Sequence, residues 1–385
     1  MIRIAADERS LGDLVREVAG AERVAVDLEA SGMFTYRARI CTVQLAWQSG
    51  TQVAVVDTLA TPVLGLRQLL GTEGPLKIVH DVAFDTRLLA EAGVELGNVH
   101  DTAIAARMLG RVSTGLASLL ASELGIHIEK GKQQDDWRIR PLDAEMLAYL
   151  AADVDRLEAL DRSLSLEMMD RGIESEVLEE TRYRLASAAA AARMTQVGPP
   201  YARIKGVARL PERERAALRA LAELREREAE RRDVPPYKVV SSDTLVAIAR
   251  ARPTTPAEIF RMRGVASSTA AARAFVDELA RGVAEAGDTI PPEDHELFER
   301  PRLPAAVARA RRDREVRLLS WRRGEAKRRG VDEQVVLPGH CAKDVVDGQI
   351  ASVDELARVP GIGGFRVQRD GEAIVQALRG EEGTV

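Results

Sequence analysis

Cysteine, aromatic residues and long apolar runs are scarce in this 385-residue chain. Cys41 and Cys341 lie far apart without a Cys-x-x-Cys partner, so the sequence indicates neither a disulfide framework nor a zinc site. Aromatic residues make up 4% of the chain, so any platform for stacking single-stranded bases would be small. No run approaches the roughly 20 apolar residues of a membrane span, and the N-terminal residues are partly acidic where a secretory signal is apolar. We therefore expect a cytoplasmic protein that does not enter a membrane.

The length of the chain indicates several domains, because it exceeds what one hydrophobic core usually supports. A net charge of −5 argues weakly against a nucleic-acid-binding protein, but the charges are unevenly distributed. Between Arg300 and Arg329 few acids interrupt a run of basic residues: Arg302, Arg309, Arg311, Arg312, Arg314, Arg317, Arg322, Arg323, Lys327 and Arg328. Such a run is typical of a surface that follows phosphates, and equally of a solvated helix face.

The first half of the chain alternates strand and helix patterns, which predicts an α/β domain. Apolar runs typical of strands occupy residues 23–30, 41–47, 52–57 and 77–81, and the last of them leads into a helix through residue 90. Further helices are expected over 102–109, 115–124, 142–160 and 182–194, with Asp101 as the N-cap of the first. Gly198, Pro199 and Pro200 then mark a domain boundary.

Beyond residue 205 strand patterns mostly disappear and the sequence repeats itself. Residues 224–234, LREREAERRDV, correspond to residues 321–331, WRRGEAKRRGV, at an offset of 321 − 224 = 97 that holds as far as Gly264 and Gly361. We infer two copies of one helical domain of roughly 80 residues. The predicted domains are residues 1–195, 206–286 and 301–382.

Acidic residues follow two of the predicted strands. Asp27 and Glu29 are two positions apart at the end of a buried strand, and the strand period of two places both carboxylates on one face. Asp85 lies in the first turns of the helix that follows the strand at 77–81. Taken singly, these acids are as easily surface groups or a complement to a helix dipole.

A third acidic element is YLAADVDRL, in which Tyr149 and Asp153 are four residues apart and share a helix face. Together the four acids suit a site for two Mg²⁺ or Mn²⁺ ions, because hard cations prefer carboxylate oxygens and neutralise the repulsion between neighbouring carboxylates. Such a site can hydrolyse a phosphodiester, with Tyr149 orienting the attacking water or helping to deprotonate it.

These residues resemble the DEDD exonuclease superfamily, its tyrosine-bearing branch, and most closely the ribonuclease D family. The first motif is matched by Asp27-Leu28-Glu29, the second by HDVAFD from His80 to Asp85, and the third by Tyr149-x-x-x-Asp153. The segments DTAIAARMLG and DDWRIRPL also look like the ribonuclease D pattern, and the repeated C-terminal unit resembles the HRDC domain. The resemblance covers nearly the whole chain, in the domain order of that family.

The resemblance implies an RNase H-like α/β fold with a mixed sheet, followed by two small all-α HRDC-like domains. It also implies a metal-dependent 3′→5′ exoribonuclease that releases 5′-mononucleotides, with tRNA precursors as typical substrates. Because these positions match the family's motifs, the resemblance implies that Asp27, Glu29, Asp85 and Asp153 bind metal and that Tyr149 positions the water.

Nucleic-acid contacts are predicted less sharply than the catalytic ones. His80 is a candidate to touch substrate, although packing or a local hydrogen bond is the simpler interpretation. In the second HRDC-like domain, phosphate binding is assigned to Arg322 and Arg323 in the basic run and to the turn containing Gly361 and Gly363. The first copy ends differently, so its nucleic-acid contacts are more doubtful.

No nucleotide cofactor is expected, because GIHIEKGKQ has the wrong glycine spacing for a P-loop and lacks its Ser or Thr. A DNA exonuclease is the alternative enzyme, because the same metal chemistry cleaves either backbone. A non-catalytic RNA-binding protein with a vestigial acidic cluster is the alternative from another class. The sequence does not reveal the oligomeric state, for which a monomer is the default.

Overall fold

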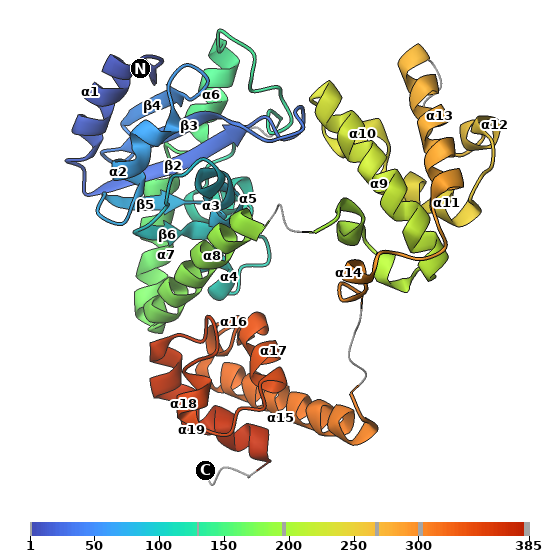
Figure 1. Ribbon diagram of the computed structural model, residues 1–385. Helices are drawn as coiled ribbons and strands as arrows, with labels where there is room; N and C mark the ends of the chain where they lie inside the picture. Colours follow the sequence, from blue (N-terminus) through green and yellow to red (C-terminus); the bar gives the residue numbers. More distant parts are fainter. Residues whose placement is uncertain (1, 129–130, 195–197, 266–268, 299–302, 381–385) are drawn as a thin grey trace. The chain divides into compact units, whose positions relative to one another are not determined.

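A computed structural model describes residues 2–128, 131–194, 198–265, 269–298 and 303–380 (Figure 1). Arg300 and Arg302 of the basic run lie outside these residues. Within the described residues, no helix combines the length and apolar character needed to cross a membrane. The cytoplasmic location stays a prediction.

A six-stranded mixed sheet forms the centre of the N-terminal domain, in the order β1-β4-β3-β2-β5-β6. Its strands are β1 (Ile2–Ala5), β2 (Arg23–Ala30), β3 (Ile40–Trp47), β4 (Gln52–Asp57), β5 (Leu76–Val79) and β6 (Val99–Asp101). β3 pairs with β4 antiparallel, whereas β2 pairs with β5 and β5 with β6 in parallel. The four strands predicted from the apolar runs are confirmed, and the α/β class with a mixed sheet is confirmed with them. β1 and β6 are short and were not predicted.

Helices surround this sheet (Figure 1). They are α1 (Glu8–Val18), η1 (Val63–Leu66), α2 (Arg67–Leu70), α3 (Val82–Glu91), α4 (Thr102–Met108), α5 (Leu116–Leu124), α6 (Ala144–Ala152), α7 (Leu157–Arg171) and α8 (Glu174–Met194). α3 packs along α8, and the central strand β3 is buried over its whole length. The helix expected over 182–194 is the end of the longer α8.

One predicted helix, over residues 142–160, is in fact two. α6 ends at Ala152 with Asp153 as its C-cap residue, and α7 begins at Leu157. Asp153 still has helical backbone angles, φ −73° and ψ −19°, so its spacing from Tyr149 keeps the relation expected on one helix. Apolar periodicity continues across the break, and this is why the sequence pattern did not predict it.

The rest of the chain is helical, and its described residues contain no strand, as predicted. Its elements are η2 (Pro200–Arg203), η3 (Val207–Arg209), α9 (Glu212–Arg232), α10 (Pro236–Val239), α11 (Ser242–Ala251), α12 (Pro256–Phe260), α13 (Ala270–Glu285), α14 (Pro292–His295), α15 (Ala305–Arg329), α16 (Glu333–Val336), α17 (Gly339–Asp347), α18 (Val353–Leu356) and α19 (Gly364–Arg379). Each repeat copy has its own buried apolar core.

The chain separates into two compact units. Residues 1–29, 40–194 and 303–385 form one unit, and residues 30–39 and 195–302 form the other. The second unit therefore combines the first helical repeat with the loop that follows β2. In that unit the Tyr36 N–H donates to the Asp233 carboxylate over 3.1 Å, and Arg37 pairs with Glu230 at 3.6 Å. The three domains predicted from the sequence remain a proposal.

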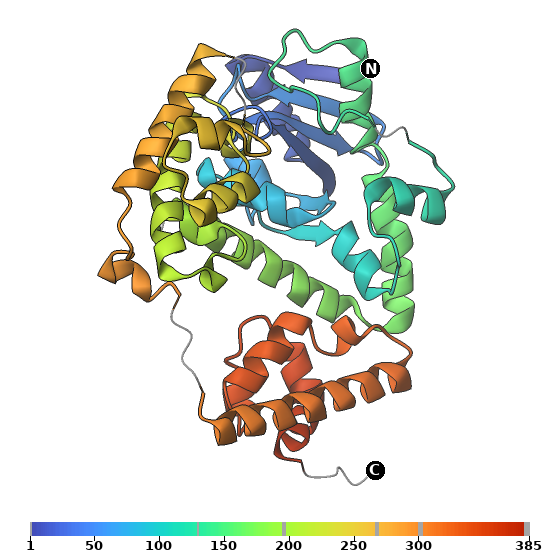
Figure 2. The same ribbon diagram turned by 90° about the vertical axis from the view of Figure 1, so that its right-hand side faces the viewer.

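In the first unit the second helical repeat packs directly on α8, which lies beside α16 to α19 in Figures 1 and 2. The rings of Tyr183 on α8 and His340 on α17 stack at 3.8 Å with 1° between their planes. On the same helix α8, Glu176 is fully buried and accepts hydrogen bonds from Arg329 and Arg369. Aromatic stacking and buried charge thus join the two domains into one body.

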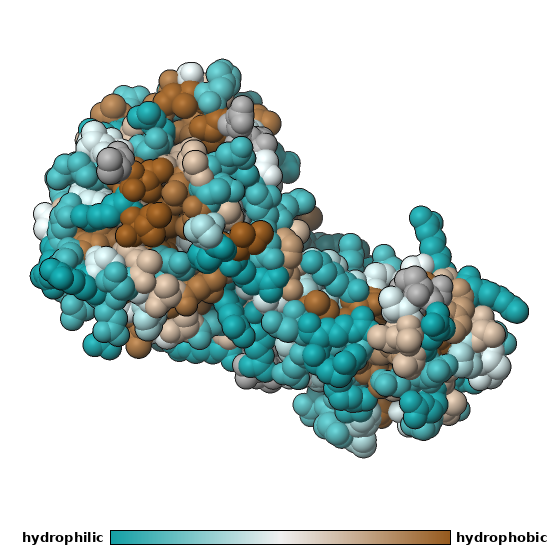
Figure 3. Space-filling model, turned by 90° about the horizontal axis from the view of Figure 1, so that it is seen from above, coloured by the Kyte–Doolittle hydropathy of each residue, from teal (hydrophilic) through white to brown (hydrophobic). Residues whose placement is uncertain are grey.

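The surface is mixed rather than uniformly polar. Figure 3 shows hydrophilic residues over much of the drawn face, with hydrophobic residues gathered in separate areas between them. Large exposed apolar side chains include Phe84 on α3, Val316 on α15 and Phe365 on α19. Most of the surface of a folded protein is apolar in this scattered way, so these residues mark no site by themselves.

Candidate active site

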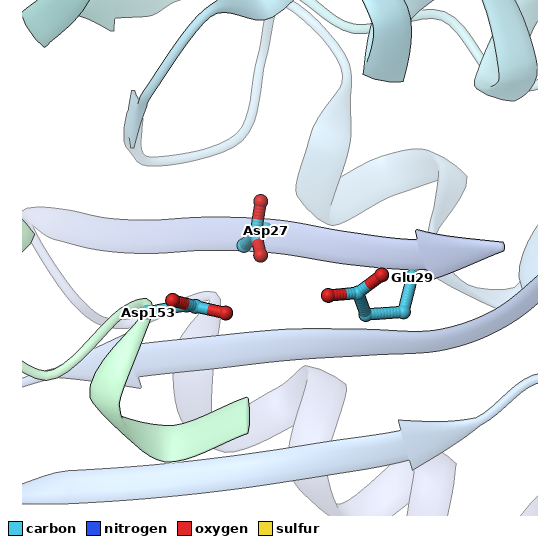
Figure 4. A group of neighbouring side chains, drawn as sticks. All are labelled: Asp27, Glu29 and Asp153. Atoms are coloured by element: carbon cyan, nitrogen blue, oxygen red, sulfur yellow. The ribbon is translucent and has the colours of Figure 1, made fainter. Parts of the chain in front are cut away.

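Three carboxylates from two distant parts of the sequence meet at the centre of the sheet (Figure 4). Asp27 and Glu29 project from β2, and Asp153 projects from the end of α6. Each offers an oxygen atom, and these three atoms lie within 4.8 Å of one another. The strand period of two puts Asp27 and Glu29 on the same face, as predicted, and the i, i+4 relation of α6 brings Asp153 to them together with Tyr149.

Asp85 approaches the cluster from α3, in the first turn after β5. It lies outside the 4.8 Å group. Burial is the main cause of its raised pKa, and the carboxylates of Asp27 and Glu29 raise that pKa further, so Asp85 is within electrostatic reach of the cluster. Of the four predicted acids, the structure thus gathers three closely and places the fourth beside them.

The pKa values of Asp27, Glu29 and Asp153 are raised because these half-buried acids are partly withdrawn from water and close together. Burial, followed by the Asp153 carboxylate, raises the pKa of Asp27 to about 8. Burial and three neighbouring carboxylates, those of Asp27, Asp153 and Asp135, raise the pKa of Glu29 to about 9. The pKa of Asp153 is raised to about 6 by burial, against a hydrogen bond from Tyr149 that lowers it. Neighbouring carboxylates with raised pKa values are typical of functional sites.

Tyr149 is held by packing and by a hydrogen bond. Its ring lies 5.7 Å from the ring of Trp137, which is buried in a cluster with Cys41, Met146 and Leu150. Its hydroxyl hydrogen-bonds with Asp153, and burial together with that carboxylate raises the pKa of Tyr149 well above its usual value. The hydroxyl of Tyr149 therefore stays protonated in the metal-free protein and can donate a hydrogen bond.

The segment DDWRIRPL, noted for its family resemblance alone, has a structural role that spacing did not predict. Arg140 makes a two-point ion pair with Asp57 on β4, at 2.6 and 2.8 Å, and donates to the Cys41 carbonyl over 2.9 Å. This bidentate contact anchors the segment that carries Trp137 to the sheet. Two arginines that follow an aromatic residue are too common in sequences for their partners to be predicted.

His80 makes local hydrogen bonds. Its Nδ1 lies 2.9 Å from the Thr102 hydroxyl, it is hydrogen-bonded to the backbone of Thr114, and burial lowers its pKa. These contacts support the simpler of the two interpretations of this residue, a neutral imidazole that joins neighbouring segments. Contact between His80 and substrate stays a prediction.

The two arginines predicted to bind phosphate occupy different environments. Arg322 is buried on α15, and its Nε donates to the Glu333 carbonyl over 2.9 Å. Arg323 has three quarters of its side chain exposed and lies 3.7 Å from the Glu333 carboxylate. Only Arg323 of the pair is thus presented to solvent, where a phosphate could reach it.

The turn containing Gly361 and Gly363 lies against α8. A Cβ on Gly361 would be 2.4 Å from the Tyr183 ring, and a Cβ on Gly363 would be 2.0 Å from the Glu179 carboxylate. Both glycines have positive φ, 77° and 79°, which favours glycine. These placements account for the glycines through close packing between domains, and the predicted phosphate contact has no support from them.

Comparisons with known proteins agree with this arrangement. A family profile described as 3′-5′ exonuclease matches residues 2–169, and the HRDC domain profile matches residues 214–281 and 312–378. Ribonuclease D of Acidiphilium cryptum is 30% identical over 77% of this chain and 74% of its own length. Ribonuclease D of Zymomonas mobilis is 30% identical over 68% of this chain and 67% of its own length. The predicted pair of HRDC-like copies is thereby confirmed.

The fold agrees with a solved structure of a protein of the same name. The crystal structure of Escherichia coli RNase D, described as an exoribonuclease involved in structured RNA processing, superimposes with a TM-score of 0.71 over 99% of both chains at 22% identity. At that identity the likeness establishes the fold alone. Taken with the sequence matches to curated relatives, the sheet order and the gathered acids, it leads to one conclusion: this chain belongs to the ribonuclease D family.

Proposed function

We propose that this protein is a metal-dependent 3′→5′ exoribonuclease that removes 5′-mononucleotides from RNA ends and trims tRNA precursors or other structured RNAs. The observation that carries the proposal is the convergence of Asp27, Glu29 and Asp153, with Asp85 beside them. Family membership supports the same reaction class.

The acid cluster fits hard divalent cations. Its members offer carboxylate oxygens, which Mg²⁺ and Mn²⁺ prefer over nitrogen or sulfur ligands. Every cause acting on the pKa of Glu29 raises it, so the local surroundings are short of positive charge. A dication placed among these oxygens would reverse that imbalance. We assign the ions to Asp27, Glu29, Asp85 and Asp153, and propose two ions per active site.

Bound divalent ions would activate the attacking water and stabilise the leaving oxygen at phosphorus. The protein's own groups supply the rest. Water adds to the phosphorus of the terminal phosphodiester and the bond from phosphorus to the 3′ oxygen breaks, which leaves a shorter RNA and a 5′-mononucleotide. Tyr149 remains protonated and orients the water through its hydroxyl, while Asp153 holds that hydroxyl in place.

The proposal is tested with a 5′-labelled, tRNA-like RNA that carries a 3′ trailer, incubated with wild type or Asp27→Asn protein. We expect a ladder that shortens from the 3′ end with Mg²⁺ or Mn²⁺, disappears with EDTA, and is absent in the variant. A matched DNA oligonucleotide runs alongside, because only contacts to the 2′-hydroxyl distinguish the two backbones. Degradation of DNA alone would favour the DNA exonuclease, and binding without cleavage would favour the RNA-binding alternative.

The RNA would also contact the helical domains. Arg323 is the exposed cation of the predicted pair, and it lies on the basic α15. Such a surface raises the effective concentration of RNA at the active site by holding its backbone. We treat the protein as a monomer, and sedimentation at micromolar concentration measures this directly.

A further prediction concerns protons released on metal binding. The pKa of Asp27 is about 8 and that of Glu29 about 9 in the metal-free protein, so both carboxyls are mostly protonated at pH 7. A cation binds the deprotonated forms, so binding at pH 7 releases protons and tightens as the pH rises towards 9. Calorimetric Mn²⁺ titration in two buffers of different ionisation enthalpy measures the release. Asp27→Asn should release fewer protons, and a pH-independent affinity would contradict the prediction.

A further inference from the structure

Asp101, outside the predicted catalytic set, makes more backbone contacts than an ordinary helix cap requires. One carboxylate oxygen accepts from the N–H groups of Ala103 and Ile104, at 2.8 and 3.0 Å, and so caps α4 as predicted. The other oxygen accepts from the Val82 N–H over 2.8 Å, and Val82 is the first residue of α3. A single carboxylate therefore caps two helices.

The register of the sheet explains how one side chain reaches both helices. Val79, the last residue of β5, is paired with Asp101, the last residue of β6. The strands β5 and β6 therefore end at the same level of the sheet, and the helices α3 and α4 that follow them start side by side. Asp81, which precedes α3, has left-handed backbone angles (φ 64°, ψ 69°), and its N–H also points to Asp101 at 3.3 Å. A carboxylate at this place stabilises a backbone conformation that a residue with a Cβ seldom adopts.

The capped helix carries one of the four acids. Asp85 lies three residues after Val82, less than one turn into α3, so the position of the first turn sets the position of its carboxylate. Asp101 is 2% exposed and Asp85 is 8% exposed, so packing around both side chains restricts their movement. We propose that Asp101 is a positioning residue that fixes the start of α3 and thereby aims Asp85 at the metal cluster.

Asp101 differs from a helix cap that serves folding alone, because both of its carboxylate oxygens are used and they hold two different helices. Both oxygens of the carboxylate are acceptors: one accepts from the N–H groups of Asp81, Ala103 and Ile104, and the other accepts from the N–H of Val82. Asparagine has the same shape but one acceptor, so its amide NH₂ would face a backbone N–H. If the asparagine oxygen stays with the two donors of α4, the Val82 N–H loses its acceptor and the first turn of α3 shifts.

This inference rests on the proposed role of Asp85 as a metal ligand, and the experiment separates the two. Mn²⁺ binding without RNA is measured by calorimetry for wild type, Asp101→Asn and Asp85→Asn, together with turnover as a function of Mn²⁺ concentration. Asp332→Asn is the matched control, because Asp332 caps α16 in the second helical domain with the same chemistry. Circular dichroism establishes that each variant is folded.

We expect Asp101→Asn to bind Mn²⁺ about 10- to 100-fold more weakly than wild type, the usual effect of changing a residue that orients a ligand. Raising the Mn²⁺ concentration should restore much of its turnover, whereas Asp85→Asn should stay inactive. Asp332→Asn should match wild type in both measurements. If Asp101→Asn does not fold, Asp101→Ser carries the test, because a hydroxyl can still cap α4 while reaching one helix only.

Wild-type affinity and metal dependence in folded Asp101→Asn would overturn the inference while leaving the proposed function standing. Loss of turnover that no Mn²⁺ concentration restores, with unchanged Mn²⁺ affinity, would also overturn it. If wild type binds no Mn²⁺, or if Asp85→Asn binds as wild type does, the assignment of Asp85 fails and this inference falls with it.

Discussion

Replacing Glu29 by glutamine removes exonuclease turnover, by on the order of 1000-fold or more, and at the same time makes the metal-free protein more stable. The loss follows because one ligand oxygen of the acid cluster is gone, and about 4 kcal/mol of lost transition-state stabilisation corresponds to a factor of 1000. The gain in stability follows because the Glu29 carboxylate is withdrawn from water and held among other carboxylates, with no cause that lowers its pKa.

The pH dependence of that gain has a definite sign. The pKa of Glu29 is raised to about 9 in the folded protein, so the folded state holds a proton that the unfolded chain loses near pH 4 to 5. The free energy of unfolding of the wild type therefore decreases as the pH rises from that range to about 9. Glutamine does not titrate, so the variant's advantage should be absent at pH 4 and largest near pH 9.

The measurement is thermal unfolding in EDTA at pH 4, 7 and 9, with turnover assayed separately in Mg²⁺. We expect a rise in melting temperature of about 3 °C or more at pH 9, given roughly 2–4 °C for each kcal/mol in a domain of this size. Glu22→Gln is the matched control, because Glu22 is 89% exposed just before β2. Equal shifts for both variants, or a Glu29→Gln protein that keeps its turnover, would contradict the account.

The parts of the site that the sequence predicted are those set by local periodicity. Asp27 and Glu29 share a face because a strand repeats every two residues, and Tyr149 and Asp153 share one because a helix repeats every 3.6. The cap on α4 was predictable for the same reason, since the acceptor and its donors are three residues apart at most. The apolar runs predicted four strands because a buried strand consists of apolar residues over a short continuous stretch of sequence.

The parts that the sequence did not predict depend on contacts between distant residues. The second oxygen of Asp101 reaches Val82, 19 positions earlier, through a strand register that no local pattern encodes. The glycine turn was assigned to phosphate because glycine-rich turns bind anions, yet here it faces Tyr183 and Glu179 of a helix about 180 positions earlier. A glycine needed for close approach looks the same in sequence whatever approaches it.

The contact between α8 and the second helical domain leads to the other large effect. Glu176 is fully buried and pairs with Arg329 and Arg369, whose side chains are 14% and 27% exposed. Next to it Arg366, also fully buried, donates to the Glu176 carbonyl over 3.2 Å. Glu176→Ala should lower the free energy of unfolding by about 3–5 kcal/mol, because removing this buried partner leaves Arg329 and Arg369 to share the carboxylate of Asp370.

Urea unfolding measures this loss, with Glu315→Ala as the control because Glu315 pairs with Arg311 on the exposed side of α15 at 3.3 Å. An exposed pair contributes about 0–1 kcal/mol, so the two variants separate clearly. Protease treatment locates the change: the second helical domain should become susceptible first, since its contact with α8 includes this cluster. Equal losses in both variants would mean that the Tyr183–His340 stack and apolar packing hold the domain without the buried charges. A large loss would mean that one carboxylate on α8 keeps the two domains in a single body.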